Sequence, residues 1–521
     1  MKANLIQALA AVLAACSFAA PGHAEWREAS SPHFTVLGDM SESELRERTL
    51  QLERYDATLR YLLGVRETAP VTVYVLDGLG AVQQAAGGRI RTIAGFYRAD
   101  AQGANAVVPE KLNFYVEDFN PRVILFHEYA HHMLLSNTEA FMPGWAQEGL
   151  AEMFATAKLN ADGSVTIGDK NDSRGSTMFG AHRWSVQRML ESDFDPPTRD
   201  EVGEKYARGW AMVHYLWMSG ERRGQYLDFI TELNRTVDPV ASGRKVFGDL
   251  DRLERELNHY VSVHRFNLST FSAAQIAASS DVAIRALSQG EADMLAYRLV
   301  STLGVTQETA GPLAERARPV AARYPDNARV QTWLAEMEYD AKNYDAASAA
   351  ADRALAVEPN NLFAMIYKGR VAMSRAVAAG DDAALLQDAR GWFRRANRAN
   401  PNHALPFVLN YDSFGAVGEM PPANAVMGLY RAAVLVPQDP LVRMRAAVAL
   451  LREGQVGRAR SVLAPAAFVA EGTGENNALK LIKEMETTSD PAMLLAKAAE
   501  LKLDINEFTA PPEDGASADE G

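Results

Sequence analysis

The sequence HEYAHH, at residues 127–132, restricts the possible structures of this chain more than any other feature. Residues four apart share one face of a helix, so His127 and His131 can direct their imidazole nitrogens toward a single metal ion. The surrounding segment, PRVILFHEYAHHMLL at residues 121–135, has Pro121 at a suitable helix start and apolar residues at helical spacing. It therefore predicts a helix that carries half of a metal site.

A second predicted helix, which follows Pro143, can complete this site. Its EGLAE run places Glu148 and Glu152 one turn apart. Two histidines and Glu148 are the ligand types of a catalytic zinc site, which keeps its fourth position open for water. Zinc lowers the pKa of such a water to about 7, and Glu128, beside the histidines, could then remove its proton. We therefore expect Zn²⁺ and a hydrolase, although manganese or cobalt could occupy the same ligands in vitro.

These motifs resemble those of the gluzincin metallopeptidases, which include thermolysin and the aminopeptidase N group. HEYAH matches the zinc helix of that family, and AQEGLAE, at residues 146–152, is similar to its NEGxA motif. YARG, at residues 206–209, is similar to the YEKG segment of the aminopeptidases. The resemblance implies a thermolysin-like zincin domain of the α+β class.

The resemblance also implies a role for each site residue. The implied zinc ligands are His127, His131 and Glu148. Glu128 would act as the general base, and Tyr206 would donate a hydrogen bond to the oxyanion on the side away from the metal. Glu152 would orient a ligand histidine by accepting a hydrogen bond from it.

Some positions depart from the aminopeptidase pattern. Gln147 replaces the Asn of NEGxA, and Ala207 replaces the Glu of YEKG. The spacing between HEYAH and EGLAE is shorter than usual, so Glu152 remains an alternative third ligand. No GxMEN segment is present to bind a free amino terminus, so we do not expect an aminopeptidase. The closer resemblance, over residues 26 to about 235, is to the peptidase-MA-like gluzincins of bacterial envelopes, and we expect an endopeptidase.

Three further histidines lie in segments that could contribute to the site. His132 follows the motif but points away from its metal-binding face, which favours packing or hydrogen bonding. His214 is an alternative oxyanion donor, although its apolar helix favours a core histidine whose ring nitrogens have partners. His182, in the sequence GAHRW, could line the cleft.

The first part of the chain is predicted to mix strands and helices. Ser41 and Glu44 are spaced as a capping box for a helix at residues 44–63. Residues 105–108 are a candidate edge strand that would pair with the backbone of an extended substrate. The alternative is an ordinary core strand. Residues 158–181 are typical of a surface loop that could rim the cleft. The predicted strands are residues 33–37, 71–76, 94–97, 104–108 and 112–116.

From about residue 290 the sequence predicts helical repeats. Pro325 and Pro359 lie 34 residues apart, which is the period of the tetratricopeptide repeat, and the following unit contains eight extra residues. Small residues between the helices would let them pack into one continuous core. The concave face of such a stack could bind substrate or a partner protein, and a scaffold that only supports the first domain is the alternative. The positions that fit the repeat are Leu334, Ala335, Tyr344, Ala347, Ala354, Gly369, Ala389, Phe393, Ala396, Pro401, Ala432, Pro437, Gly454 and Ala459.

The first residues favour export. Residues 1–24 are typical of a secretory signal, since Lys2 precedes an apolar stretch that is too short to span a membrane. This pattern predicts a periplasmic or secreted protein that is cleaved after Ala24. Cys16, the only cysteine, lies in a sequence that resembles a lipobox, so a lipid-anchored protein is the alternative. In either case the mature chain has no disulfide.

The sequence thus predicts an exported zinc-dependent peptidase whose repeats bind substrate or a partner protein. Its net charge of −13 argues against a nucleic-acid partner. The alternative function is an envelope scaffold that binds through its repeats and has only a vestigial zinc site. The predicted parts are a signal peptide at residues 1–24, a metallopeptidase domain at 25–265, a connecting segment at 266–289, repeats at 290–505 and a disordered acidic tail at 506–521.

Overall fold

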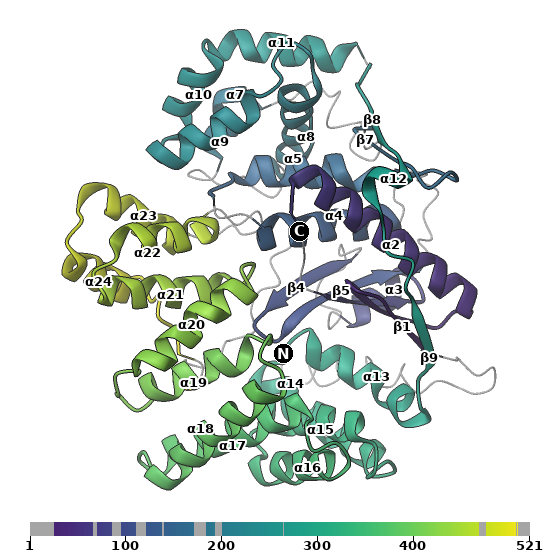
Figure 1. Ribbon diagram of the computed structural model, residues 1–521, viewed down its shortest axis with the longest axis vertical. Helices are drawn as coiled ribbons and strands as arrows, with labels where there is room; N and C mark the ends of the chain where they lie inside the picture. The colour runs from purple at the N-terminus through teal and green to yellow at the C-terminus, as the bar shows by residue number, and fades with distance from the viewer. Residues whose placement is uncertain are drawn as a thin grey trace.

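The structure is a computed structural model, shown in Figure 1. It describes residues 26–65, 70–85, 95–110, 121–137, 140–170, 184–192, 201–263, 265–467, 476–506 and 508. The predicted signal sequence, the predicted strand at residues 112–116, His182 and nearly all of the acidic tail lie outside these residues. Within the described ranges, no helix has the length and apolar character needed to cross a membrane.

The largest sheet among the described residues is a six-stranded mixed sheet. Its strand order is β4-β5-β3-β2-β1-β9, with parallel pairing of β3 to β2 and to β5 and antiparallel pairing elsewhere. The strands are β1 (Arg27–Ser30), β2 (Phe34–Gly38), β3 (Val71–Leu76), β4 (Phe96–Asp100), β5 (Gly103–Pro109) and β9 (Ala283–Ala286). A smaller sheet contains β6 (Lys158–Leu159), β7 (Val165–Ile167) and β8 (Ser269–Phe271). The predicted connecting segment therefore contributes a strand to each sheet.

The two faces of the large sheet pack against different parts of the chain, because alternate residues of a strand point to opposite sides. On β3, Val73 and Val75 belong to the core that contains Phe126 of the HEYAHH helix. Tyr74, between them, belongs to a separate core that contains Leu295 of the later helical region. The sheet thus lies between the site helices and the start of the helical region, as Figure 1 shows.

Helix α2 (Glu42–Leu63) supports the HEYAHH helix. Its predicted capping box is confirmed, because the Ser41 hydroxyl accepts from the Glu44 amide and the Glu44 carboxylate accepts from the Ser41 amide. The Tyr55 ring stacks on Phe126 with centroids 3.8 Å apart, and the Tyr55 hydroxyl donates to the Phe126 carbonyl oxygen at 2.9 Å. This contact fixes the turn that immediately precedes the first predicted ligand.

Both predicted site helices are confirmed, and a third helix crosses the second of them at two glycines. The three helices are α4 (Pro121–Asn137), α5 (Gly144–Ala155) and α8 (Val202–Met218). A Cβ atom on Gly149 would lie 2.3 Å from the Gly209 carbonyl oxygen, and one on Gly209 would lie 2.5 Å from that of Trp145. Only glycine permits such a close approach of two backbones. The glycines of EGLAE and YARG therefore bring the helices of Glu148 and Tyr206 together.

The prediction that residues 105–108 form an edge strand was wrong. These residues lie in β5, which pairs with β3 on one side and with β4 on the other. A strand with two neighbours has no free row of backbone groups for an extended peptide, so the alternative of an ordinary core strand is correct. Among the described strands, β4 forms this edge of the sheet.

The chain after the large sheet is a long helical region, as predicted. Asn327 caps α15 and Asn361 caps α17, and each side chain accepts from the amide three residues later, which explains why two Pro-x-Asn sequences recur at the predicted period. Helices α17 and α18 have 17 residues each, whereas α15 and α16 have 13 and 14, so the extra residues lengthen both helices of that pair. The helices are α13 (Gln289–Thr302), α14 (Gln307–Ala321), α15 (Ala328–Asp340), α16 (Tyr344–Val357), α17 (Leu362–Ala378), α18 (Ala383–Ala399), α19 (Leu405–Gly415), α20 (Ala423–Leu435), α21 (Pro440–Arg452), α22 (Val456–Leu463), α23 (Asn477–Thr487) and α24 (Pro491–Glu500).

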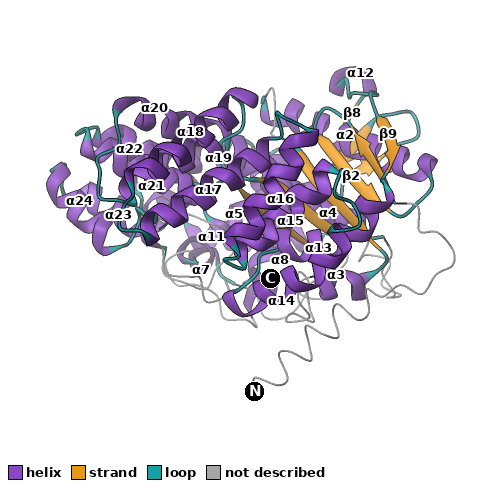
Figure 2. Cartoon of the chain, turned by 90° about the horizontal axis from the view of Figure 1, so that it is seen from below, coloured by secondary structure: helices purple, strands orange, loops and turns teal. Residues whose placement is uncertain are grey.

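Small residues lie where these helices touch. Gly369 of α17 faces the Phe393 ring of α18, and a Cβ atom on Gly369 would lie 2.5 Å from it. Ala347, Ala354 and Ala389 are fully buried. Helix pairing and period agree with the predicted repeats, and their identity as tetratricopeptide repeats stays a prediction. Figure 2 shows the strands on one side of the molecule and α20, α22 and α24 on the other.

The other described helices lie in both parts of the chain. They are α3 (Leu79–Ala85), α7 (Val186–Glu191), α9 (Gln225–Thr236), α10 (Pro239–Phe247), α11 (Leu250–Ser262), α12 (Ala273–Ile276) and a 3-10 helix (Ala464–Ala467) in the helical region.

The glycine crossing gives a testable prediction for stability. Gly149→Ala should lower the free energy of unfolding by about 1–3 kcal/mol, because its methyl group would overlap a backbone carbonyl. Denaturant unfolding measures this change. Gly311→Ala in α14 is the control, because nothing lies within 4 Å of its added Cβ, and it should stabilise the chain by about 0.5–1 kcal/mol. Equal effects of the two substitutions would contradict the close crossing.

Candidate metal centre

The three predicted ligand side chains lie together in the structure. Nε2 of His127 is 3.1 Å from Nε2 of His131, and Oε2 of Glu148 is 3.4 Å from the first and 3.3 Å from the second. The histidines come from successive turns of α4, and Glu148 comes from the neighbouring helix α5. The three atoms therefore form a nearly equilateral triangle, which we call the ligand triangle.

The dimensions of the ligand triangle fit a tetrahedral metal ion. Zinc binds imidazole nitrogen and carboxylate oxygen at about 2.0–2.1 Å, so two ligands at the tetrahedral angle lie about 3.3 Å apart. The observed separations of 3.1, 3.3 and 3.4 Å agree with that value. Two imidazoles and one carboxylate also leave one position of such an ion open. The side chains thus have the donors and spacing that Zn²⁺ requires, and its binding stays a prediction.

The Glu148 carboxylate needs a positive charge beside it. It is fully buried, and neither oxygen has a hydrogen-bond partner among the described residues. Burial alone would raise the pKa of this carboxyl, but His131 and His127 beside it lower the pKa well below its usual range. A buried carboxylate without hydrogen bonds is costly unless a cation faces it. A metal ion held by the same two imidazoles would supply that cation.

Glu152 lies on the far side of the ligand triangle. Its Oε1 is 3.7 Å from Nδ1 of His127, which is the ring nitrogen directed away from the triangle. A residue that orients a ligand histidine occupies this position in metal sites. Of the two carboxylates that the sequence left as alternatives, the structure brings Glu148 into the triangle and Glu152 behind it.

Tyr206 lies beside the same group. Its ring stacks on that of His127, with centroids 5.9 Å apart and an angle of 18° between the planes. Glu128 follows His127 in α4, and its carboxylate adds to the effect of burial in raising the pKa of the Tyr97 phenol well above its usual value. Residues from the three helices α4, α5 and α8 therefore lie at the ligand triangle.

Tyr97 was missed by the sequence reasoning. Its hydroxyl shares a hydrogen bond with Nδ1 of His132, which links the edge strand β4 to α4. The residue lay in a predicted strand, but no motif marked it, because the contact joins positions 35 residues apart.

The predictions for His132 and His214 agree with the structure. His132 is buried and bonded to Tyr97, as expected for a packing or hydrogen-bonding role. His214 is fully buried, with Nε2 2.9 Å from the Gly168 carbonyl oxygen and Nδ1 2.7 Å from the Tyr260 hydroxyl. Burial lowers its pKa to about 4. His214 is therefore a core histidine whose two ring nitrogens both have partners, as the sequence favoured.

A buried polar cluster between α2 and α4 holds α4 in place. Tyr129, which lies between the ligand histidines in sequence, donates to Oδ1 of Asp56 at 2.6 Å. Nε of Arg60 donates to Oδ2 of Asp56 at 2.6 Å. His33 and Glu53, 2.8 Å apart, complete the cluster, and the hydrogen bond to Glu53 raises the pKa of His33. His33, Glu53 and Asp56 have metal-ligand types, but both Asp56 oxygens already accept hydrogen bonds, which favours a structural role.

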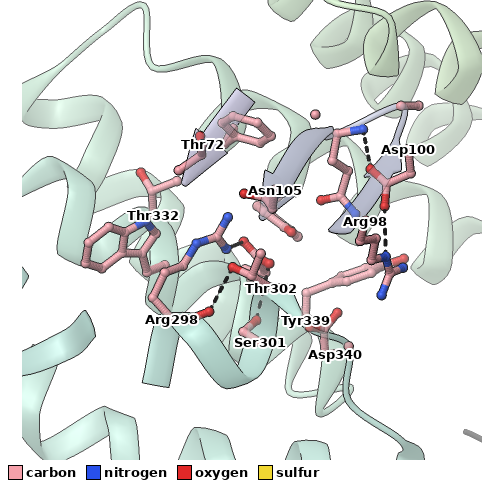
Figure 3. Close-up of a pocket in the computed structure, with 18 of the residues that line it drawn as sticks. Thr72, Arg98, Asp100, Asn105, Arg298, Ser301, Thr302, Thr332, Tyr339 and Asp340 are labelled. Atoms are coloured by element: carbon pink, nitrogen blue, oxygen red, sulfur yellow. Dashed lines mark hydrogen bonds and ion pairs between the residues drawn. The ribbon is translucent and has the colours of Figure 1, made fainter. Parts of the chain in front are cut away.

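A cavity of about 1250 Å³ lies on the opposite face of the sheet (Figure 3). Thr72 and Asn105 of the sheet and Tyr339 of α15 line it. Its charged lining consists of five cationic and five anionic side chains. Three of the ion pairs are Arg298 with Glu336, Arg329 with Glu28, and Arg98 with Asp100. This charge balance suits an uncharged polar ligand better than a strongly charged one.

Comparison with known proteins concerns the part of the chain that contains the ligand triangle. Residues 124–241 match the model of a family described as a protein of unknown function (DUF1570). No curated protein matches the chain. The matched residues include α5, α8 and all but the first three residues of α4, and thus every predicted site residue.

Metal content tests the ligand triangle directly. The purified chain should bind one zinc ion, and His131→Ala and Glu148→Ala should each abolish binding because two ligands do not hold the ion. Glu152→Ala should weaken the affinity by about 10- to 100-fold. Elemental analysis and competition with a chelator measure these changes. His259→Ala, at an exposed position of α11, is the control. If Glu148→Ala still bound zinc, the third ligand would be a residue other than Glu148.

Proposed function

We propose that this chain is an exported zinc-dependent endopeptidase of the gluzincin type. The ligand triangle of His127, His131 and Glu148 is the observation that carries the proposal. Tyr206 beside it and the position of Glu128 in HEYAH support hydrolysis in addition to metal binding. A thermolysin-like first domain is part of the same proposal, and the mixed sheet packed against α4 supports it.

Each residue of the site would have a distinct chemical role. When bound, zinc would supply Lewis-acid activation of water and of the substrate carbonyl. Glu128 would accept the proton of the attacking water and deliver it to the leaving amine. The Tyr206 phenol would donate a hydrogen bond to the carbonyl oxygen as negative charge develops there. Glu152 would hold the His127 ring in orientation through Nδ1.

Export belongs to the proposal because of residues 1–24, which have the pattern of a secretory signal. Cleavage after Ala24 would release a periplasmic or secreted protein. Modification of Cys16 would instead anchor the protein to a membrane by a lipid. The substrate in either case would be a peptide or protein outside the cytoplasm.

The alternative function is binding by the helical region. The charge-balanced cavity between the sheet and α15 favours it, because a polar cavity of this size can accept a ligand without any hydrolysis. As a scaffold, the chain would bind a partner there and keep only a vestigial zinc site. As a peptidase, it would use the same region to recruit substrate or a partner protein. Glu128 and Tyr206 distinguish the two functions, because a scaffold needs neither.

Glu128→Gln tests hydrolysis. The substitution removes the general base but keeps the size of the side chain, so peptide cleavage should fall at least about a hundredfold. Zinc content and unfolding temperature should stay unchanged. Cleavage of a peptide library, with and without a zinc chelator, provides the measurement. Glu47→Gln, at an exposed position of α2, should have no effect. If the variant cleaved as fast as the unchanged chain, the peptidase proposal would fail.

Tyr206→Phe tests the oxyanion role. Loss of the phenolic hydroxyl should lower kcat by about a hundredfold, because the donor acts on charge that develops in the transition state. KM and zinc content should change little. Steady-state kinetics on the best library peptide measure both constants, with Tyr61→Phe, at an exposed position, as the control. Unchanged kcat would remove Tyr206 from the mechanism.

A further inference from the structure

The loop that joins the two ligand helices is anchored in the helical region. Phe141 lies between α4 and α5 and is fully buried. It belongs to a hydrophobic core whose other members, apart from Val237, come from residues 447–503. The connection between the histidine helix and the Glu148 helix thus depends on packing against α21 to α24.

Arg460 of α22 fixes Phe141 from outside this core. Its guanidinium carbon lies 5.4 Å from the centroid of the Phe141 ring, within the range of a cation–π contact. Nη2 of Arg460 donates to the Asn234 carbonyl oxygen at 2.9 Å, and Glu486 accepts from its Nε at 2.9 Å. Asn234 in turn accepts from the Phe141 amide at 2.8 Å and donates to the Phe141 carbonyl oxygen at 3.0 Å. Arg460 therefore contacts both the ring and the residue that holds its backbone.

The anchored loop leads directly into the helix of Glu148. The Gln147 amide side chain donates back to the Met142 carbonyl oxygen at 2.6 Å. The Pro143 carbonyl oxygen accepts from the Gln147 backbone amide at 3.0 Å. Metal sites tolerate deviations of only about 0.2 Å in ligand distance. A small shift of Phe141 would therefore change the distance between Glu148 and the two histidines.

The helical region also contacts α4 and β4. In the last turn of α4, the Ser136 hydroxyl donates to Oε1 of Gln438 at 3.4 Å. Ala101, at the tip of the β4–β5 hairpin, is buried in another core of the helical region. The same hairpin carries Tyr97, which is bonded to His132 of α4. Helix α4, the residue Phe141 ahead of α5, and the β4–β5 hairpin are thus each tied to the helical region.

We propose that the helical region positions the metal ligands, with Phe141 and Arg460 as positioning residues. The inference rests on the proposed function, because positioning of the ligands affects catalysis only if the site hydrolyses peptides. In that case the helical region is part of the catalytic unit. A partner that rearranges α21 and α22 would then change metal affinity and activity without touching the site. This coupling is a route for regulation of hydrolysis.

Hydrogen–deuterium exchange on the full-length chain without metal tests this positioning. In Arg460→Ala and Phe141→Ala, the amides of α5 should exchange about tenfold faster or more, because the loop ahead of them loses its anchor. Zinc affinity, measured by competition with a chelator, should weaken by about 10- to 100-fold. Arg458→Ala is the matched control, since this arginine lies on the same helix at an exposed position and donates to Gln455 within its own turn.

A second control separates positioning from general loss of stability. Leu313→Ala opens the core formed by α14 and its neighbours, far along the chain from Phe141. Leu313→Ala should lower the unfolding temperature without faster hydrogen exchange in α5. Phe141→Leu should restore most of the protection from exchange that α5 loses in Phe141→Ala. Unchanged α5 exchange in both anchor variants, or equal acceleration by Leu313→Ala, would overturn the inference. If the unchanged chain bound no zinc while α5 still responded to the anchor variants, the peptidase proposal would fail and the positioning would stand.

Discussion

The buried contact between the Glu148 carboxylate and two imidazoles is the constraint on which the other features of this molecule depend. A carboxylate that is fully removed from water requires a cation at a fixed distance. Its helix must therefore be held in place from several directions. The Gly149–Gly209 crossing fixes it against α8, and the Tyr129–Asp56 hydrogen bond fixes the opposing helix against α2. Packing in the first part of the chain thus maintains the spacing of the three atoms of the ligand triangle.

Local patterns in the sequence predicted the parts of the site that lie on single helices. The i, i+4 spacing of His127 and His131 and the capping box at Ser41 depend only on neighbouring residues, and both features are present in the structure. Residue spacing alone could not decide between Glu148 and Glu152, because the choice depends on how α5 packs against α4. The motif resemblance favoured Glu148, and that residue lies in the ligand triangle.

Contacts between distant segments could not be predicted. The interior position of β5, the bond between Tyr97 and His132, and the burial of Phe141 among residues 447–503 all join parts of the chain that no local pattern relates. The domain border is another example. The segment at residues 266–289 was predicted to be a connecting segment, yet β9 pairs with β1 and Arg285 bonds to Glu28 across that pairing. Arg329 of α15 bonds to the same carboxylate, which makes the border between the two parts a charged network rather than a linker.

The burial of the β4–β5 hairpin tip determines where this architecture can change in length. The turn between α17 and α18 is exposed at Asp381, which adopts a left-handed φ of 68°, and the pair it joins already contains extra residues. Ala101 of the hairpin, in contrast, is 8% exposed and packs inside the helical region. A longer hairpin would push apart the sheet and the helices that hold it. The exposed turn between α17 and α18 can therefore accept extra residues, whereas packing limits the hairpin to its present length.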